Sequence, residues 1–166
     1  MRLCYLGGDE RRRYLQEAAS PGVIVERLAD FTPSVGRPET IESLFDEALL
    51  APWTVEMAVE AERRGYDAVI TGCAGDPGVE AAREMVRIPV IGPGQAALHT
   101  AVMLGTMFGV LTPLESTLRL ASALPVPVVN VLRTSVRVAE LLVGSRLTHS
   151  KIAYPTPPAR HAVVTS

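Results

Sequence analysis

Five short apolar runs, each close to a glycine or proline, have the length of β-strands, and they lie at 2–6, 23–27, 67–72, 88–92 and 107–111. Most are apolar at successive positions instead of alternating with polar residues. This is typical of parallel strands that helices cover on both faces. The pattern predicts an α/β fold with three layers, α/β/α, around a mostly parallel sheet. A further run at 126–132 is predicted to add another strand.

Helical spacing marks the segment from Pro38 to Arg64. Its first apolar residues recur at i, i+3, i+4, i+7 and i+8, which predicts one buried stripe along a helix. The stripe consists of Ile41, Leu44, Phe45, Ala48 and Leu49. Pro52 is predicted to kink or restart this helix. The acidic residues off the stripe are predicted to face water, and they are Glu39, Glu42, Asp46 and Glu47.

Capping residues predict where other helices begin. Asp76 suits an N-cap and Pro77 the first helical position after the third run. Thr112 and Glu115 form a capping-box pattern around Pro113. The remaining predicted helices span 11–19, 113–124 and 135–143, and one more lies between the fourth and fifth runs.

Composition and charge limit the classes of partner. The chain has 166 residues, 48% hydrophobic and 20% charged, which is enough for one globular core. A net charge of −2 gives no electrostatic case for binding nucleic acid. The stretch from Ile88 to Leu114 lacks Asp, Glu, Lys and Arg and is long enough to span a membrane. Prolines and glycines divide it into strand and helix lengths, so we predict core and no membrane partner.

The chain has two cysteines, Cys4 and Cys73, which form neither a CxxC pair nor a disulfide framework. That usage predicts a reducing cytoplasm, and no signal peptide is evident at the N-terminus. Cys4 lies inside the first run and is predicted to be a small core residue.

Cys73 follows the third run directly, so we expect it at the carboxyl end of a parallel strand, beside the N-terminus of a helix. Ligands bind at this edge of open parallel sheets. Helix-terminal N–H groups favour the thiolate over the thiol and could hold a substrate carboxylate. Free cysteine is also among the most buried residue types. A reactive thiol and an inert buried cysteine therefore both fit this position.

Two stretches resemble a known family. DAVITGCAGDPGVEAAREMVRIPVIGPGQAALHTAVMLGTMFGVLTP and the upstream GRPETIESLFDEALLAP are similar to the first half of the Asp/Glu racemase superfamily, in its hydantoin and allantoin racemase branch. The resemblance covers about 36–113. It implies that Cys73 is catalytic and that Ala74, Gly75 and Thr112 contact the substrate. Gly8 is assigned to substrate binding as well, because it lies where many relatives grip the carboxylate with Asn-Pro-x-Thr/Ser.

The chain also departs from this family. Complete members have two similar lobes, and each lobe contributes one cysteine to opposite faces of the substrate. No cysteine follows Cys73 here. The resemblance therefore predicts a first lobe at 1–94, a truncated second lobe at 95–144 that includes the run at 126–132, and a proline-rich tail at 145–166.

Three functions remain open. The first is a racemase or epimerase of a hydantoin, allantoin or Asp/Glu type of substrate, which uses the Cys73 thiolate and needs no cofactor or metal. The second is a one-thiol lyase or isomerase of the same superfamily, and the third is a non-catalytic binding module. His99 is given no catalytic role. The expected partners are a small molecule with a carboxylate or hydantoin ring and a second copy of the chain, because an incomplete lobe leaves apolar surface uncovered.

Overall fold

The computed structural model describes residues 1–41, 43–109 and 127–158, and its centre is a four-stranded sheet in the order β2-β1-β3-β4. The strands are β1 (Arg2–Leu6), β2 (Ile24–Glu26), β3 (Ala68–Thr71) and β4 (Val90–Ile91). Every neighbouring pair is parallel. The first four predicted strands and the parallel sheet are therefore confirmed.

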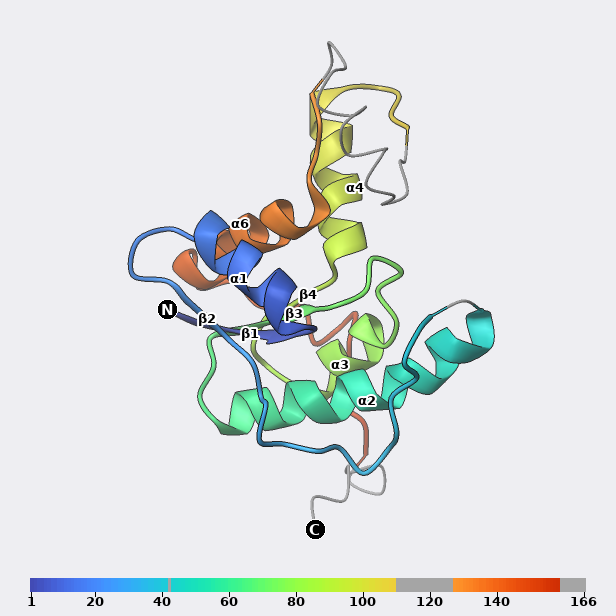
Figure 1. Cartoon of the computed structure of the whole chain (residues 1–166). Coiled ribbons are helices and arrows are strands. Elements are labelled where there is room, and N and C mark those ends of the chain that lie inside the picture. The colour runs from blue at the N-terminus through green and yellow to red at the C-terminus, as the bar shows by residue number, and fades with distance from the viewer. Residues whose placement is uncertain (42, 110–126, 159–166) are drawn as a thin grey trace.

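Five described helices surround the sheet, and they are α1 (Asp9–Ala18), α2 (Leu44–Arg63), α3 (Val79–Met85), α4 (Pro93–Leu104) and α6 (Val131–Gly144). Helices α1 and α6 lie over one face of the sheet, while α2 and α3 lie over the other (Figure 1). Helix α4 points away from the sheet (Figure 1). The predicted three-layer α/β/α fold is confirmed.

Side chains of β1 alternate between the two faces, and both faces are buried. Cys4 and Leu6 join the cluster that contains residues of α2 and α3, and Leu3 and Tyr5 join the cluster that contains residues of α1 and α6. This explains why the strand is apolar at successive positions. Cys4 has no exposed surface, and burial raises the pKa of its thiol to about 12. Its predicted place in the core is confirmed.

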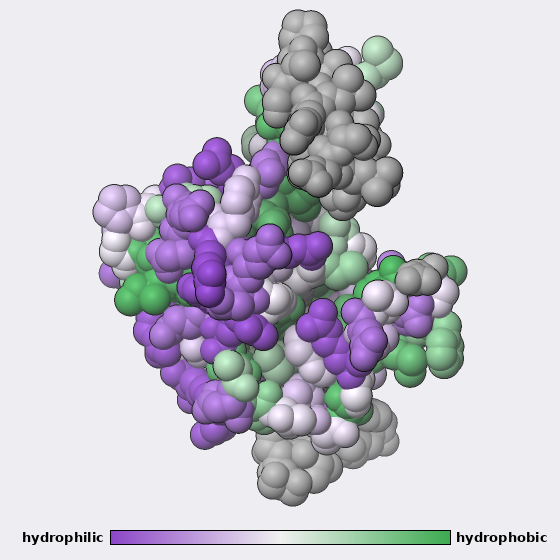
Figure 2. Space-filling view, in the orientation of Figure 1, coloured by the Kyte–Doolittle hydropathy of each residue, from purple (hydrophilic) through white to green (hydrophobic). Residues whose placement is uncertain are grey.

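Helix α2 begins at Leu44, not at Pro38, and Ser43 caps it by accepting a hydrogen bond from the N–H of Asp46. The predicted buried stripe is wrong, because Leu44 is 84% and Phe45 70% exposed. Twenty helical residues span about 30 Å, whereas the longest strand here, with five, spans about 17 Å. The first turns of α2 therefore project beyond the sheet, where Figure 2 shows apolar surface. The helix continues across Pro52.

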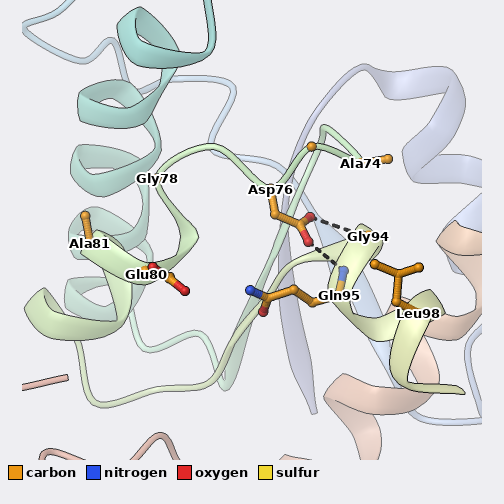
Figure 3. Close-up of a pocket in the computed structure, with 9 residues that line it drawn as sticks. Ala74, Asp76, Gly78, Glu80, Ala81, Gly94, Gln95 and Leu98 are labelled. Carbon is orange, nitrogen blue, oxygen red and sulfur yellow. Dashed lines mark hydrogen bonds between the residues drawn. The ribbon is translucent and has the colours of Figure 1, made fainter. Parts of the chain in front are cut away.

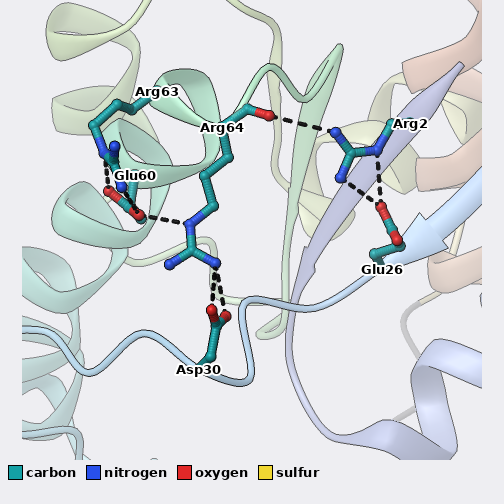
Figure 4. Close-up of polar contacts among 6 residues, drawn as sticks. All are labelled: Arg2, Glu26, Asp30, Glu60, Arg63 and Arg64. Carbon is teal, nitrogen blue, oxygen red and sulfur yellow. Dashed lines mark hydrogen bonds and ion pairs between the residues drawn. The ribbon is translucent and has the colours of Figure 1, made fainter.

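Ion pairs hold the other end of α2 (Figure 4). Glu60 is 3% exposed and accepts hydrogen bonds from Arg63 and Arg64 at 2.6 Å. The bond from Arg63 is the main cause that lowers the pKa of Glu60 to about 2. Arg64 also pairs with Asp30 at 2.7 Å, which joins α2 to the loop after β2.

Two later strand predictions do not hold where the chain is described. Residues 107–109 have no regular secondary structure, and Met107 is 90% exposed. In the run at 126–132, Val131 and Leu132 already belong to α6, because Asn130 caps this helix by accepting from the N–H of Arg133 at 3.0 Å. The helix thus starts four residues before its predicted position. The helix predicted at 113–124 lies outside the described residues.

The described part of the proline-rich tail packs against β4 and α3. The N–H of Val90 donates to Nε2 of His149 at 2.8 Å. Nζ of Lys151 donates to the carbonyl oxygens of Arg83, Glu84 and Val86 at the end of α3. A lysine at this end compensates carbonyl groups that have no partner within the helix.

Candidate active site

Cys73 lies at the carboxyl end of β3, as the sequence predicts, and is partly exposed. Gly72 allows its turn to approach the turn after β1 very closely. A Cβ added at Gly72 would lie 2.3 Å from the carbonyl oxygen of Leu6 and 3.1 Å from Cα of Gly7. Any larger residue would separate these two turns. The turn with Gly8 and the turn with Cys73 therefore lie side by side at one edge of the sheet.

Asp76 does not cap the helix that follows it. Helix α3 begins at Val79, and its N-cap is Gly78 with φ 76°, while Asp76 itself has φ 57°. The Asp76 carboxylate instead accepts from the N–H groups of Gly94 (3.1 Å) and Gln95 (2.6 Å) in the first turn of α4 (Figure 3). Burial raises the pKa of Asp76, and these two bonds oppose the rise. Asp76 therefore occupies two N–H groups of α4, which cannot also bind a substrate.

Two glycines permit this contact between the Cys73 turn and α4. A Cβ at Gly94 would lie 2.1 Å from the carbonyl oxygen of Ala74, and a Cβ at Gly92 would lie 2.5 Å from Cγ of Asp76. The glycine-rich sequence before α4 thus lets backbone and carboxylate approach closely. The local structure around Cys73 depends on residues about twenty positions further along the chain.

Glu47 lies close to Cys73, which the sequence analysis missed. A Cβ added at Gly75 would be 2.6 Å from Oε1 of Glu47 and 3.7 Å from Sγ of Cys73. The carboxylate and the thiol therefore border the same small space. The prediction that Glu47 only faces water is wrong, because α2 carries this residue over the edge of the sheet. The similarity of GRPETIESLFDEALLAP to the family was the one signal that could have indicated a role for it.

A pocket of about 560 Å³ lies between the turn that follows Cys73 and the first turns of α3 and α4 (Figure 3). Ala74 and Gly75 line it, as do Asp76, Glu80, Gln95 and Leu98. Among residues 1–41, 43–109 and 127–158, no group accepts a hydrogen bond from the N–H of Ala74 or Gly75. These two N–H groups can thus serve a ligand.

The other predicted site residues are distributed as follows. Gly8 is the N-cap of α1, is exposed, and has open space around it. Thr112 lies outside the described residues. His99 is exposed on α4. Within the described part of the chain, no three His, Cys, Asp or Glu side chains are grouped as metal ligands would be.

A family model and two hydantoin racemases match this chain in sequence. The Asp/Glu/Hydantoin racemase family model matches residues 13–122. The chain is 41% identical over 88 residues to a hydantoin racemase of Pseudomonas sp. (strain NS671), a match that covers 53% of this chain and 35% of that protein. It is 35% identical over 98 residues to a hydantoin racemase of Paenarthrobacter aurescens, covering 58% and 40%. The matches thus span 35% and 40% of the length of these relatives.

Solved structures with a similar fold include two allantoin racemases. The one from Klebsiella pneumoniae has a TM-score of 0.77 at 24% identity, and the match covers 96% of this chain and 95% of that chain. The one from Pseudomonas fluorescens has a TM-score of 0.74 at 24% identity, with coverage of 95% and 97%. These likenesses concern the fold. The family model matches most of the chain, and it shows that the chain belongs to the Asp/Glu/hydantoin racemase family.

Proposed function

We propose that the chain is a cofactor-independent racemase or epimerase of a small amino-acid derivative of the hydantoin, allantoin or Asp/Glu type. In this proposal the Cys73 thiolate removes the Cα proton. The observation that carries it is a partly exposed thiol at the carboxyl edge of a parallel sheet, with the Glu47 carboxylate beside it, in a chain of this family. Cys4 cannot share this role, because it has no exposed surface.

The proposed proton path begins at Glu47. Its carboxylate takes the proton of the Cys73 thiol and becomes the neutral acid. The thiolate then takes the Cα proton of the substrate, which regenerates the thiol and leaves a carbanion delocalised onto the neighbouring carbonyl oxygen. The N–H groups of Ala74 and Gly75 would stabilise that oxygen. Return of a proton from Cys73 restores the starting hand, and Glu47 then gives its proton back to the thiolate. Delivery of a proton from water on the other face inverts the centre, and the hydroxide that remains takes the proton of the neutral Glu47 acid.

Exchange of the Cα proton with deuterated solvent, followed by NMR, tests the role of Cys73. We expect exchange into at least one of three substrates, 5-methylhydantoin, allantoin or glutamate. Cys73→Ala should abolish it, and Cys4→Ala should retain it as the matched thiol control. Exchange that survives in Cys73→Ala overturns the assignment of the base. If the unmodified protein exchanges the Cα proton of none of the three substrates, the proposed activity is overturned, and the non-catalytic binding module is the function that remains.

Glu47→Gln tests the proton acceptor. A positioned base contributes a factor of ~10²–10⁴ to the rate, so we expect the variant to lose at least ~10²-fold in exchange rate. The pH–rate profile should also change, because the variant has no carboxylate at this position to take the proton of the thiol. Glu39→Gln, which replaces an exposed acidic residue upstream of the same helix, is the control. An unchanged profile in Glu47→Gln would show that the carboxylate takes no part.

The chain is also proposed to self-associate. In support, a series of apolar side chains at the end of α4 and just after it is at least 45% exposed: Leu98, Val102, Met103, Leu104, Met107 and Phe108. Sedimentation should show dimers or larger species, and a monomer at high concentration would contradict this. None of the described helices is long and apolar enough to cross a membrane. A cytoplasmic location and the division at 1–94, 95–144 and 145–166 stay predictions.

A further inference from the structure

A second pocket, of about 240 Å³, opens at the carboxyl ends of β1 and β2. Tyr5 and Gly7 at the end of β1 form one wall, the loop that carries Arg27 and Arg37 forms another, and Trp53 of α2 contributes the third. Gly7 is the residue whose Cα closely faces Gly72, the neighbour of Cys73. This pocket and the Cys73 turn therefore meet along the same edge of the sheet.

The Tyr5 hydroxyl is the first sign that this pocket binds a ligand. Tyr5 is 1% exposed, and its hydroxyl has no partner in hydrogen-bonding geometry among the described residues. A Cβ at Gly7 would lie 2.4 Å from this hydroxyl oxygen, so the ring extends beneath Gly7 to the edge of the sheet. Buried hydroxyl groups are rarely left without a partner, because the lost contact with water is then not replaced.

Three arginines near this pocket have no carboxylate partner among the described residues, and two of them, Arg27 and Arg37, line it together with Tyr5. Burial raises the pKa of Tyr5, and the positive charges of Arg11, Arg37 and Arg27 oppose this rise. Nη1 of Arg11 donates to the carbonyl oxygen of Gly72 at 3.5 Å, and Arg37 stacks on Trp53 at 5.2 Å. No described carboxylate pairs with any of the three. Arg2, Arg63 and Arg64, in contrast, all have acidic partners (Figure 4).

We propose that this pocket binds the carboxylate of a small organic anion. Arg27 and Arg37 donate to its oxygens, as guanidinium groups do in charge-assisted pairs, and the Tyr5 hydroxyl donates a third bond. The Trp53 ring packs against the carbon atoms of the ligand. Inorganic phosphate shares the negative charge but has no apolar part for this ring.

The position beside Cys73 then defines a substrate class, a step that rests on the proposed function. A molecule whose carboxylate lies between Arg27 and Arg37 would extend past Gly7 towards Cys73. The substrates are therefore acidic derivatives, such as a hydantoin that carries a carboxylate on its side chain. Neutral hydantoins would lack the contact with the arginines.

Calorimetric titration of the Cys73→Ser protein tests the binding without turnover. The probes are hydantoin-5-acetate and the neutral 5-methylhydantoin, and we expect the first to bind at least about 10-fold more tightly, as loss of a charge-assisted hydrogen bond would predict. Arg27→Gln and Arg37→Gln should each weaken hydantoin-5-acetate about 10-fold, and Tyr5→Phe should weaken it while keeping the ring. Arg87→Gln, an exposed arginine before β4, is the control and should change nothing.

Several results would overturn the inference. One is equal binding of the two hydantoins, and another is binding that Arg27→Gln and Arg37→Gln leave unchanged. Tighter, arginine-dependent binding of inorganic phosphate would assign the pocket to a free anion and overturn the substrate class. Arginine-dependent binding of hydantoin-5-acetate without Cα exchange in the unmodified protein refutes the proposed function but supports the carboxylate pocket. Exchange of 5-methylhydantoin as fast as hydantoin-5-acetate refutes the substrate class but supports the proposed function.

Discussion

Gly94→Ala isolates the contact that shapes the Cys73 turn. Gly94 is in the first turn of α4, where alanine by itself would be the better helix former, by at most about 1 kcal/mol. The added methyl group, however, would lie 2.1 Å from the carbonyl oxygen of Ala74 and 3.0 Å from Oδ2 of Asp76. Helix propensity and packing therefore predict opposite signs for the change in the free energy of unfolding.

Packing should dominate. The first contact is with backbone, so relief requires the Ala74 turn or the start of α4 to move, and overpacking of this kind costs about 1–3 kcal/mol. The same movement strains the hydrogen bonds from Gly94 and Gln95 to the Asp76 carboxylate, and a hydrogen bond to a charged group contributes about 1.5–3 kcal/mol. After subtraction of the gain in helix propensity that alanine brings, we expect Gly94→Ala to destabilise the protein by about 2–4 kcal/mol.

Urea unfolding followed by circular dichroism measures this change. With a slope of about 1–3 kcal/mol per molar urea, the midpoint should fall by about 1–2 M without a change in slope. The matched control is Gly144→Ala in α6, where a Cβ meets nothing within 4 Å and alanine should stabilise by about 0.5–1 kcal/mol. A midpoint for Gly94→Ala at or above that of the unmodified protein would refute the packing argument.

Three further predictions concern the tail and α2. Burial lowers the pKa of His149 to about 4, so the unfolded state binds a proton at a higher pH than the folded state does. The free energy of unfolding should therefore fall as the pH is lowered from 6.5 to 4. We expect a loss of about 1–2 kcal/mol, a value reduced because half of the ring is exposed to solvent. His149→Gln keeps an acceptor for Val90 and should remove this dependence in urea titrations at several pH values; an equal slope in both proteins would contradict it. Lys151→Met removes the hydrogen bonds to the carbonyl oxygens at the end of α3 and should lower the free energy of unfolding by about 1–3 kcal/mol. Ile152→Ala, at a 96% exposed position, is the control and should leave it unchanged, and equal effects of the two variants would refute the capping role. Arg63 holds the pKa of Glu60 at about 2, so the ion pair stabilises the folded protein above pH 4.5 and this stabilisation is lost as the pH falls towards 2. Glu60→Gln should flatten the plot of the free energy of unfolding against pH between these values, and an unaltered plot would contradict the pairing.

Local patterns failed where the outcome depends on a distant part of the chain. The apolar positions at the start of α2 have correct helical spacing, yet Leu44 and Phe45 are exposed because the helix is longer than the strands it covers. Asp76 has the sequence of an N-cap, yet its carboxylate binds the N–H groups of another helix. Periodicity states which residues share a face, and it does not state how much of that face a neighbour covers.

The sequence by itself determined the first four strands, their parallel arrangement, the buried Cys4 and the position of Cys73 at a strand end. These follow from runs of a few residues between glycines and prolines, which restrict the backbone locally. Only the tertiary structure decided that Glu47 borders Cys73 and that Tyr5, Arg27 and Arg37 line one pocket. These contacts join residues from different helices, loops and strands, whose distances depend on how the layers pack and leave no period or spacing in the chain.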